Sequence, residues 1–259
     1  MCRLAAYLGL AIPLRQFLLD PPHSLYRQAR EPQELLYTTL NADGYGFGWY
    51  SPEGTPSTYT NALPIWSDSN LPSLARTLYS KLWVAEVRSA TEGNPVHQFN
   101  TQPFSDSALL FVHNGFIQDF HEQVRPGILQ RLAPAVSAAI HGNTDSEYLF
   151  ACLRQIMLDE PELQPAAAIS RLFELLRGMV DNRPALLNLL ITDGARLYAA
   201  RHGLNHDSPS LYYTTSDPRY PGGQLVASER FSTHDSWQPV PEHHILTLAP
   251  GRAPELQAL

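Results

Sequence analysis

Met1-Cys2-Arg3-Leu4-Ala5-Ala6-Tyr7-Leu8-Gly9 opens the chain and predicts both a strand and a nucleophile. The run from Cys2 to Leu8 is mostly apolar, which indicates a buried strand that ends at Gly9. If Met1 is removed, Cys2 carries a thiol and a free α-amine. An unperturbed thiol has a pKa of ~8.5 and an α-amine a pKa of ~7.7–8.0, so a small shift lets the amine take the thiol proton at neutral pH. A lone cysteine is more often buried filler, and the rest of the chain decides between the two.

The composition is that of a globular chain. It has 259 residues, 44% hydrophobic and 17% charged, and we expect a single domain over residues 1–259. No window approaches the ~18–20 apolar residues of a membrane span, and no secretory signal is present, so we expect a cytoplasmic protein without a membrane partner. A net charge of -7 argues against nucleic acid. Two cysteines make no disulfide framework, which fits a reducing compartment.

Periodicity predicts strands on both sides of a helical region. We expect helices at 14–19, 24–29, 71–80, 144–158 and 169–180, and strands at 81–88, 108–112, 185–192, 196–201, 211–215, 225–228 and 245–248. Thr144 and Glu147 form a predicted capping box, and Cys152 falls on the apolar face of that helix, so we expect it in the core. Helices between two groups of strands favour stacked layers over a parallel βαβ series.

Two glycine-containing stretches invite other interpretations. Asn41-Ala42-Asp43-Gly44-Tyr45-Gly46-Phe47-Gly48-Trp49-Tyr50 predicts a turn that enters a strand, and it lacks the ending of a Walker motif. Asn114-Gly115, taken alone, is an ordinary turn signal.

The pair His243-His244 has no Cys or carboxylate at ligand spacing, so we predict no metal site, and nothing in the sequence calls for a cofactor.

Four signals stand together: Cys2, Arg88 in Arg-Ser-Ala-Thr, Asn114-Gly115 after a strand, and Asp145 in Gly-Asn-Thr-Asp-Ser-Glu. In order and character they resemble the class II glutamine amidotransferase domain, a member of the N-terminal nucleophile hydrolases. The resemblance covers essentially the whole chain. It implies an α+β fold, a four-layer αββα sandwich with mainly antiparallel sheets.

The resemblance also implies catalytic roles. Cys2 attacks the γ-carbonyl of a glutamyl amide and forms a thioester. The Asn114 side-chain amide and the Gly115 N–H donate to the oxyanion, and losing one such donor typically costs roughly 10²–10³ in rate. The Cys2 α-amine protonates the leaving amine and later activates water.

Substrate-binding roles follow in the same way for Arg88, Thr91, His113 and Asp145. Arg88 would hold the α-carboxylate through a bidentate pair, and Asp145 would take the α-ammonium. Asp145 has an alternative role as an acid in the first turn of a helix, and both roles are compatible.

The chain departs from the family pattern at two places. Amidotransferases commonly have Thr-His-Gly after the arginine, whereas this chain has Thr91-Glu92-Gly93, and Gln102-Pro103 stands where a histidine often precedes proline. Thr91 keeps its predicted substrate contact, but we carry no role over to Glu92 or Gln102.

Within the superfamily the chain is most similar to the γ-glutamyl hydrolases of ergothioneine biosynthesis, the EgtC type. The residues that carry this similarity are Met1-Cys2-Arg3, Leu8-Gly9, Asp20-Pro21-Pro22-His23-Ser24-Leu25, Asn41-Ala42-Asp43-Gly44, Pro64-Ile65-Trp66 and Arg88-Ser89-Ala90-Thr91. Such enzymes remove glutamate from γ-glutamyl hercynylcysteine sulfoxide. The leaving group carries a trimethylammonium, so an aromatic cage of Tyr45, Trp49, Tyr50 and Trp66 is a hypothesis, beside an ordinary core or rim role for each.

Alternatives remain open. The chain could be a glutaminase subunit that feeds ammonia to a separate synthase, or a hydrolase of glutathione-like γ-glutamyl peptides. It could also be a non-catalytic binding module, which a retained Met1 would favour. The leaving amine, the lining of the pocket by Glu229 and the oligomeric state are not defined by the sequence.

Overall fold

The computed structural model describes residues 2–34, 40–91 and 93–259. Two seven-stranded sheets form its centre. The first contains, in spatial order, β12 (Gln238–Pro239), β10 (Tyr212–Thr214), β11 (Gln224–Ala227), β1 (Arg3–Pro13), β4 (Tyr79–Val87), β2 (Tyr45–Tyr50) and β3 (Pro56–Asn61). The second contains β14 (Glu255–Ala258), β13 (His244–Leu248), β8 (Leu197–Arg201), β7 (Ala185–Thr192), β6 (Leu110–Ile117) and β5 (Phe104–Ser105), and β9 (Gly203–Leu204) pairs with β7.

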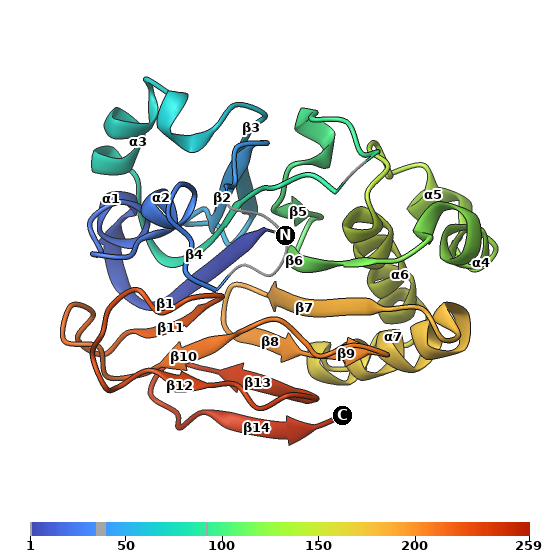
Figure 1. The fold of residues 1–259 in the computed structure, drawn as a ribbon. Helices are drawn as coiled ribbons and strands as arrows, with labels where there is room; N and C mark the ends of the chain where they lie inside the picture. The colour runs from blue at the N-terminus through green and yellow to red at the C-terminus, as the bar shows by residue number, and fades with distance from the viewer. Residues whose placement is uncertain (1, 35–39, 92) are drawn as a thin grey trace.

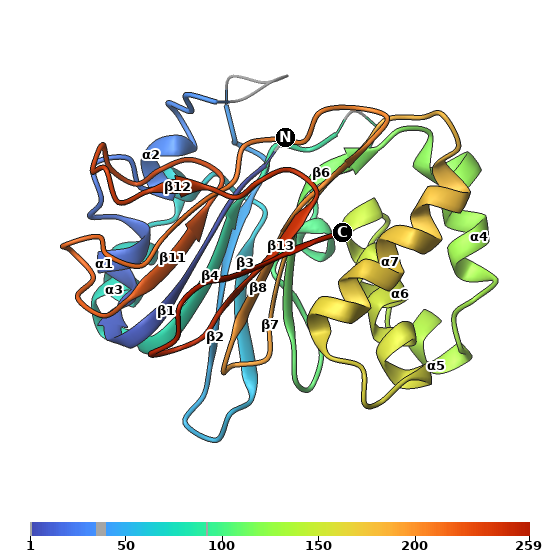
Figure 2. The same cartoon turned by 90° about the horizontal axis from the view of Figure 1, so that it is seen from below.

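Helices cover the outer face of each sheet, which confirms the predicted four-layer αββα sandwich (Figures 1 and 2). The first sheet carries α1 (Leu14–Leu18), α2 (Leu25–Gln28), α3 (Leu71–Thr77) and the 3-10 turn η1 (Ile65–Ser67). The second carries η3 (Phe120–Val124), α4 (Arg125–Leu129), α5 (Pro134–Ser137), α6 (Asp145–Asp159) and α7 (Pro165–Val180). A short 3-10 turn, η2 (Gln98–Asn100), precedes β5. All recorded strand pairs are antiparallel, as predicted.

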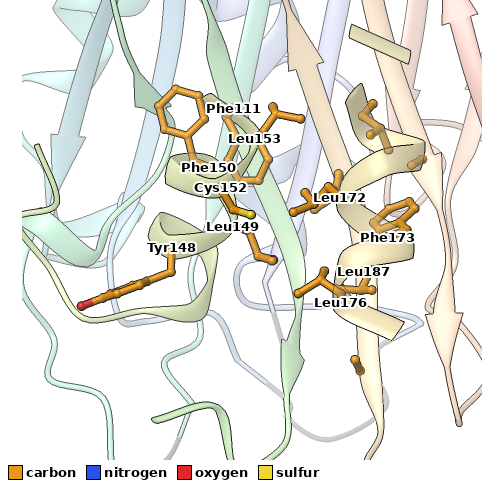
Figure 3. Packing of buried hydrophobic residues seen from close by; sticks show 14 of the residues in the cluster. Phe111, Tyr148, Leu149, Phe150, Cys152, Leu153, Leu172, Phe173, Leu176 and Leu187 are labelled. Atoms are coloured by element: carbon orange, nitrogen blue, oxygen red, sulfur yellow. The ribbon is translucent and has the colours of Figure 1, made fainter. Parts of the chain in front are cut away.

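Strand alternation explains the layers. In β1, Ala5 and Tyr7 pack with the helices of the first sheet, whereas Leu4 and Ala6 pack between the two sheets. The largest cluster joins the second sheet to α6 and α7 (Figure 3), and it includes Cys152, whose predicted core position is confirmed. Each sheet therefore buries both faces, and polar side chains inside the sandwich need a particular reason to be there.

Some sequence-based boundaries were wrong. β1 continues past Gly9 to Pro13, with a register shift between Leu8 and Ile12. Asn114-Gly115 forms no turn but lies inside β6, because the strand pairs with β7 along its whole length. Short elements without clear periodicity, including β3, β14 and α4, were not predicted.

The helix predicted from Thr144 begins as expected. The Thr144 hydroxyl accepts from the Glu147 N–H at 3.3 Å, which confirms the cap. The Glu147 carboxylate does not complete the capping box, because it accepts from the backbone N–H groups of His141 and Gly142 at 2.7 Å. Across the described ranges, no helix has the length and apolar character needed to span a bilayer.

Candidate active site

The predicted nucleophile lies at the start of β1, beside the end of β4. Arg3 is opposite Val87 in the antiparallel register, so the next residues outward, Cys2 and Arg88, come to the same end of the sheet. Cys2 is partly exposed, and its sulfur lies 3.8 Å from the Ser89 carbonyl oxygen. The sheet thus brings together two residues far apart in sequence. Met1 and Glu92 lie outside the described residues.

A row of backbone donors runs along the open edge of β6. The His113 N–H donates to Gln102 Oε1 at 2.6 Å, and the Ile117 N–H donates to Asp145 Oδ2 at 2.9 Å. Alternate N–H groups of a strand point to the same side, so the Gly115 N–H between them faces this edge as well. The Leu187 N–H, opposite Gly115, donates away from β6 to His202 O, which agrees with that orientation.

The Asn114 side chain is tied to the nucleophile strand through one serine. Asn114 Nδ2 donates to Ser228 Oγ at 3.1 Å, and the Leu4 N–H donates to the same oxygen at 3.0 Å. The Ser228 N–H in turn donates to Leu4 O at 2.9 Å. The predicted oxyanion donor is therefore anchored to the backbone two residues beyond Cys2.

Glycine is required at position 115 for lack of space. A Cβ atom there would lie 1.7 Å from the carbonyl oxygen of Leu186 and 2.7 Å from His113 Nε2. The Leu186 carbonyl is part of the β7 backbone and cannot move aside as the end of a flexible side chain could. The close approach of β6 and β7 explains why Asn-Gly occurs inside a strand here.

A cavity of about 320 Å3 opens between the end of β6 and the start of α6. Thr91 and Asp145 both line it, together with Asn94 and Ile117. Asp145 Oδ1 accepts from the Ser146 N–H at 2.8 Å, and its Oδ2 accepts from Ile117. The Ser146 hydroxyl also donates to Oδ1 at 3.3 Å, whereas Oδ2 has the Ile117 N–H as its donor and retains a second lone pair, so the acid is held in place and is still able to meet a cation.

Arg88 does not line that cavity. Its guanidinium donates to the Asp43 carbonyl at 3.3 Å and to the Pro95 carbonyl at 3.4 and 3.5 Å. These contacts are long, and no ion pair to Arg88 occurs among residues 2–34, 40–91 and 93–259. The side chain is buried and remains able to exchange weak acceptors for a carboxylate.

His113 also lies away from the cavity. Its ring faces the helical layer, where Nδ1 lies 2.9 Å from Ser146 Oγ and Nε2 lies 2.9 Å from Leu186 O. Burial, opposed by the charge of Asp145, lowers the pKa of the imidazole. A neutral ring that donates through Nε2 joins β6, β7 and α6, and both ring nitrogens lie within hydrogen-bonding distance of protein atoms.

Sequence reasoning missed a buried carboxyl in β4, the strand that pairs with β1. Glu86 lies inside β4, and Gln102 Nε2 donates to its Oε1 at 2.9 Å. The same Nε2 donates to His113 O at 2.8 Å. Gln102, left without a predicted role, thus connects Glu86 to β6. The sequence signal that could have identified it was a glutamate, Glu86, within an otherwise apolar predicted strand.

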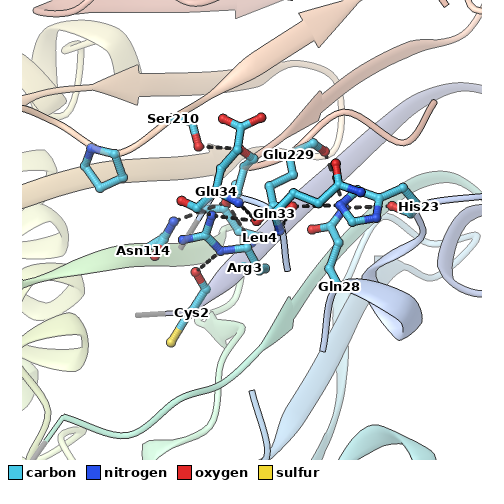
Figure 4. A network of polar contacts seen from close by, with 12 residues as sticks. Cys2, Arg3, Leu4, His23, Gln28, Gln33, Glu34, Asn114, Ser210 and Glu229 are labelled. Atoms are coloured by element: carbon cyan, nitrogen blue, oxygen red, sulfur yellow. Dashed lines mark hydrogen bonds and ion pairs between the residues drawn. The ribbon is translucent and has the colours of Figure 1, made fainter. Parts of the chain in front are cut away.

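A second buried carboxylate, Glu229, lies behind the nucleophile (Figure 4). It contacts the Arg3 guanidinium at 3.2 Å and His23 Nε2 at 2.7 Å, and it accepts from the backbone N–H groups of Gln33 and Glu34. Arg3 Nε donates to the Cys2 carbonyl oxygen at 2.7 Å. The Cys2 sulfur points away from this network, so Glu229 acts on the start of β1 through Arg3 and the Cys2 carbonyl.

The four aromatic residues of the cage hypothesis do not form one cage. Tyr50 packs against the cluster between the sheets, and its hydroxyl donates to Thr192 O at 2.7 Å. Tyr45, Trp49 and Trp66 belong to the outer cluster of the first sheet, and Trp66 lies beneath the Arg30 guanidinium at 4.5 Å. In the described part of the chain, no three His, Cys, Asp or Glu side chains gather as a possible metal site.

Comparison with known proteins gives a consistent result. The model of the family described as class II glutamine amidotransferases matches residues 33–229. A γ-glutamyl-hercynylcysteine sulfoxide hydrolase from Mycolicibacterium smegmatis is 31% identical over 246 residues, which cover 95% of each protein. A class II glutamine aminotransferase domain protein from Silicibacter pomeroyi is 28% identical, with a TM-score of 0.70 and 99% of both chains covered.

A more distant structure shows the fold alone. Glutamine phosphoribosylpyrophosphate amidotransferase from B. subtilis is 13% identical and superposes with a TM-score of 0.65 over 99% of this chain and 49% of its own. The four-layer arrangement is therefore shared beyond recognisable sequence similarity.

Proposed function

The chain belongs to the class II glutamine amidotransferase family, and from this premise we propose that it hydrolyses the γ-glutamyl amide of γ-glutamyl hercynylcysteine sulfoxide. The observation that carries the substrate assignment is the similarity to the M. smegmatis hydrolase over 95% of both chains. The products would be glutamate and hercynylcysteine sulfoxide. Cys2 and Cys152 are both free thiols, which supports a reducing, cytoplasmic location.

Cys2 is the proposed nucleophile. Once Met1 is removed, its thiol attacks the γ-carbonyl and gives a tetrahedral oxyanion. The Gly115 N–H and the Asn114 amide stabilise that charge, supported by their positions on β6 beside the start of β1. The α-amine of Cys2 supplies a proton to the leaving amine and then activates the water that cleaves the thioester.

The α-ammonium end of the glutamyl group would occupy the cavity between β6 and α6, and its α-carboxylate and γ-carbonyl would extend beyond it toward Arg88 and Cys2, which do not line the cavity. Asp145 receives the α-ammonium and Thr91 contacts the same end, because both line the cavity. Arg88 turns from its weak carbonyl contacts to the α-carboxylate, where a bidentate pair is stronger than three long bonds. The continuous pairing of β1 with β11 supports one domain over residues 1–259.

The test compares three substrates in parallel. The protein is incubated with glutamine, glutathione and γ-glutamyl hercynylcysteine sulfoxide, and released glutamate is measured, with Cys2→Ala as control. The highest kcat/KM for the sulfoxide supports the proposal. A preference for glutamine would instead identify a glutaminase subunit, and a preference for glutathione a peptide hydrolase.

A further inference from the structure

One amide of the site has its oxygen buried without a partner. Asn114 is fully buried, and in the part of the chain that the structure describes its Oδ1 accepts no hydrogen bond. Its nitrogen donates to Ser228 Oγ at 3.1 Å. An unpaired buried amide oxygen is costly, and beside the proposed reaction centre it would also repel the negative charge of an oxyanion. The orientation of this amide therefore matters for the proposed reaction.

The Ser228 hydroxyl is left incomplete by the same arrangement. It accepts from the Asn114 amide and from the Leu4 N–H at 3.0 Å, which uses both of its lone pairs. Over the described ranges its own proton meets no acceptor, although the side chain is fully buried. Two bonded neighbours, Asn114 and Ser228, thus leave one acceptor and one donor unused at the same time.

A half turn of the Asn114 amide about its Cβ–Cγ bond corrects both defects. The turn exchanges Nδ2 and Oδ1, so the oxygen takes the place 3.1 Å from Ser228 Oγ. The Ser228 hydroxyl then donates to Oδ1 and still accepts from the Leu4 N–H. The Asn114 nitrogen faces away from Ser228 with both of its protons unused. The unpaired group is now a donor, which is the kind of group that stabilises an oxyanion.

The neighbouring amide explains why Asn114 has this choice. Asn188 lies opposite Asn114 in the β6–β7 register, and its nitrogen donates to the carbonyl oxygens of Pro209 and Ser210 at 3.2 Å. A carbonyl oxygen only accepts, so these two bonds fix the orientation of the Asn188 amide. The partner of Asn114 is a hydroxyl, which is able to donate or to accept. Ser228 is itself held in place, because its carbonyl oxygen accepts from Ser210 Oγ at 2.8 Å.

We propose that Ser228 is a positioning residue whose hydroxyl donates to Asn114 Oδ1 and thereby aims the amide nitrogen at the oxyanion. The Leu4 N–H favours this direction, because it occupies a lone pair of the hydroxyl and leaves the proton for Asn114. The amide nitrogen gains its partner only as the oxyanion forms, so the stabilisation falls on the transition state. The inference rests on the proposed oxyanion role of Asn114, but the amide orientation is a property of the enzyme without substrate.

The first test measures this orientation by NMR in isotope-labelled, substrate-free enzyme. The signals of the Asn114 side-chain NH2 group are identified by their loss in Asn114→Ala. If the nitrogen faces Ser228, its protons and the Leu4 N–H proton converge on one oxygen and give a strong nuclear Overhauser effect. The proposal predicts that this strong effect is missing in wild type. Its presence would overturn the proposal, and failure of the substrate assignment would leave the measurement unchanged.

A double-mutant cycle tests the consequence for catalysis. Glutamate release is measured with whichever of glutamine, glutathione and the γ-glutamyl sulfoxide the enzyme cleaves. Ser228→Ala should lower kcat about ten- to a hundredfold with little change in KM, because the oxyanion exists only after substrate has bound. In an Asn114→Ala background the same substitution should change kcat by less than about threefold. Ser228→Thr keeps the hydroxyl and should restore most of kcat.

The cycle separates positioning from support of the fold. Ser228→Ala also leaves the buried Leu4 N–H unpaired, and this loss is the same with or without the Asn114 side chain. An equal fold-loss of kcat in both backgrounds would therefore overturn the proposal. Ser210→Ala removes a neighbouring hydroxyl that donates to Ser228 O, and it should leave kcat within about twofold of wild type. If Ser228→Ala does not fold, the NMR measurement on wild type decides alone.

Discussion

The Arg3 guanidinium lies 3.2 Å from the Glu229 carboxylate, although 226 positions separate the two residues. Both side chains are almost completely buried. The pair joins β1 to the segment after β11, and Arg3 also holds the Cys2 carbonyl. Cys2, the proposed nucleophile, is thus held by a contact that forms only when β1 and the segment after β11 lie in the same sheet.

Glu229→Gln should destabilise the fold strongly, because it leaves the buried Arg3 charge unpaired. Breaking a buried pair in this way costs about 3–5 kcal/mol. Urea denaturation measures the loss. Glu174→Gln removes an exposed partner of Arg171 and should change stability by less than ~1 kcal/mol. Equal effects of the two substitutions would contradict the structural role of Glu229.

Glu229 should also make stability depend on pH. Burial raises the pKa of its carboxyl, but bonds from His23 and the Gln33 and Glu34 N–H groups, with the Arg3 charge, hold the net pKa below the usual value. A lowered folded-state pKa contributes stability above the unfolded pKa of about 4.3, and this is lost as pH falls through the folded value. The melting temperature Tm should therefore fall less steeply between pH 7 and pH 3 in Glu229→Gln than in wild type. Parallel curves of Tm against pH for the two proteins would show that Glu229 does not account for the pH dependence of stability.

Gly115→Ala should abolish activity and lower stability, because the new Cβ would meet the Leu186 carbonyl at 1.7 Å. Either β6 separates from β7, or the Gly115 N–H, the proposed oxyanion donor, is displaced. Gly178→Ala is the matched control: nothing lies within 4 Å of its Cβ in α7, so a gain of about 0.5–1 kcal/mol is expected. Thermal melts followed by circular dichroism measure stability, and glutamate release measures activity. A Gly115→Ala protein that is active and as stable as wild type would contradict this prediction.

Arg88→Lys should raise KM for the γ-glutamyl substrate about ten- to a hundredfold, since lysine has a single ammonium and no planar fork for a carboxylate. Steady-state kinetics provides the measurement. Arg76→Lys, on the exposed side of α3, serves as the control and should leave KM unchanged. An unaltered KM in Arg88→Lys would place the substrate carboxylate elsewhere.

Local periodicity predicted most of the long strands and helices, whereas the four-layer sandwich followed from the resemblance to the family. The strand at 185–192 and the helix capped by Thr144 follow directly from alternation and capping. The pairing of Glu86 with Gln102 could not be predicted, because it depends on a contact between β4 and the segment before β5. His113 shows the same limit, since its neighbour Asn114 faces the nucleophile strand whereas its own ring faces α6.

The most direct test of the account is intact and peptide mass spectrometry of the enzyme quenched during turnover of the γ-glutamyl sulfoxide. We expect a chain that begins at Cys2 and carries one glutamyl residue on the Cys2 sulfur, with no adduct and no glutamate release in Cys2→Ala. A retained Met1 in fully active protein, or a glutamyl adduct on any other residue, would contradict it.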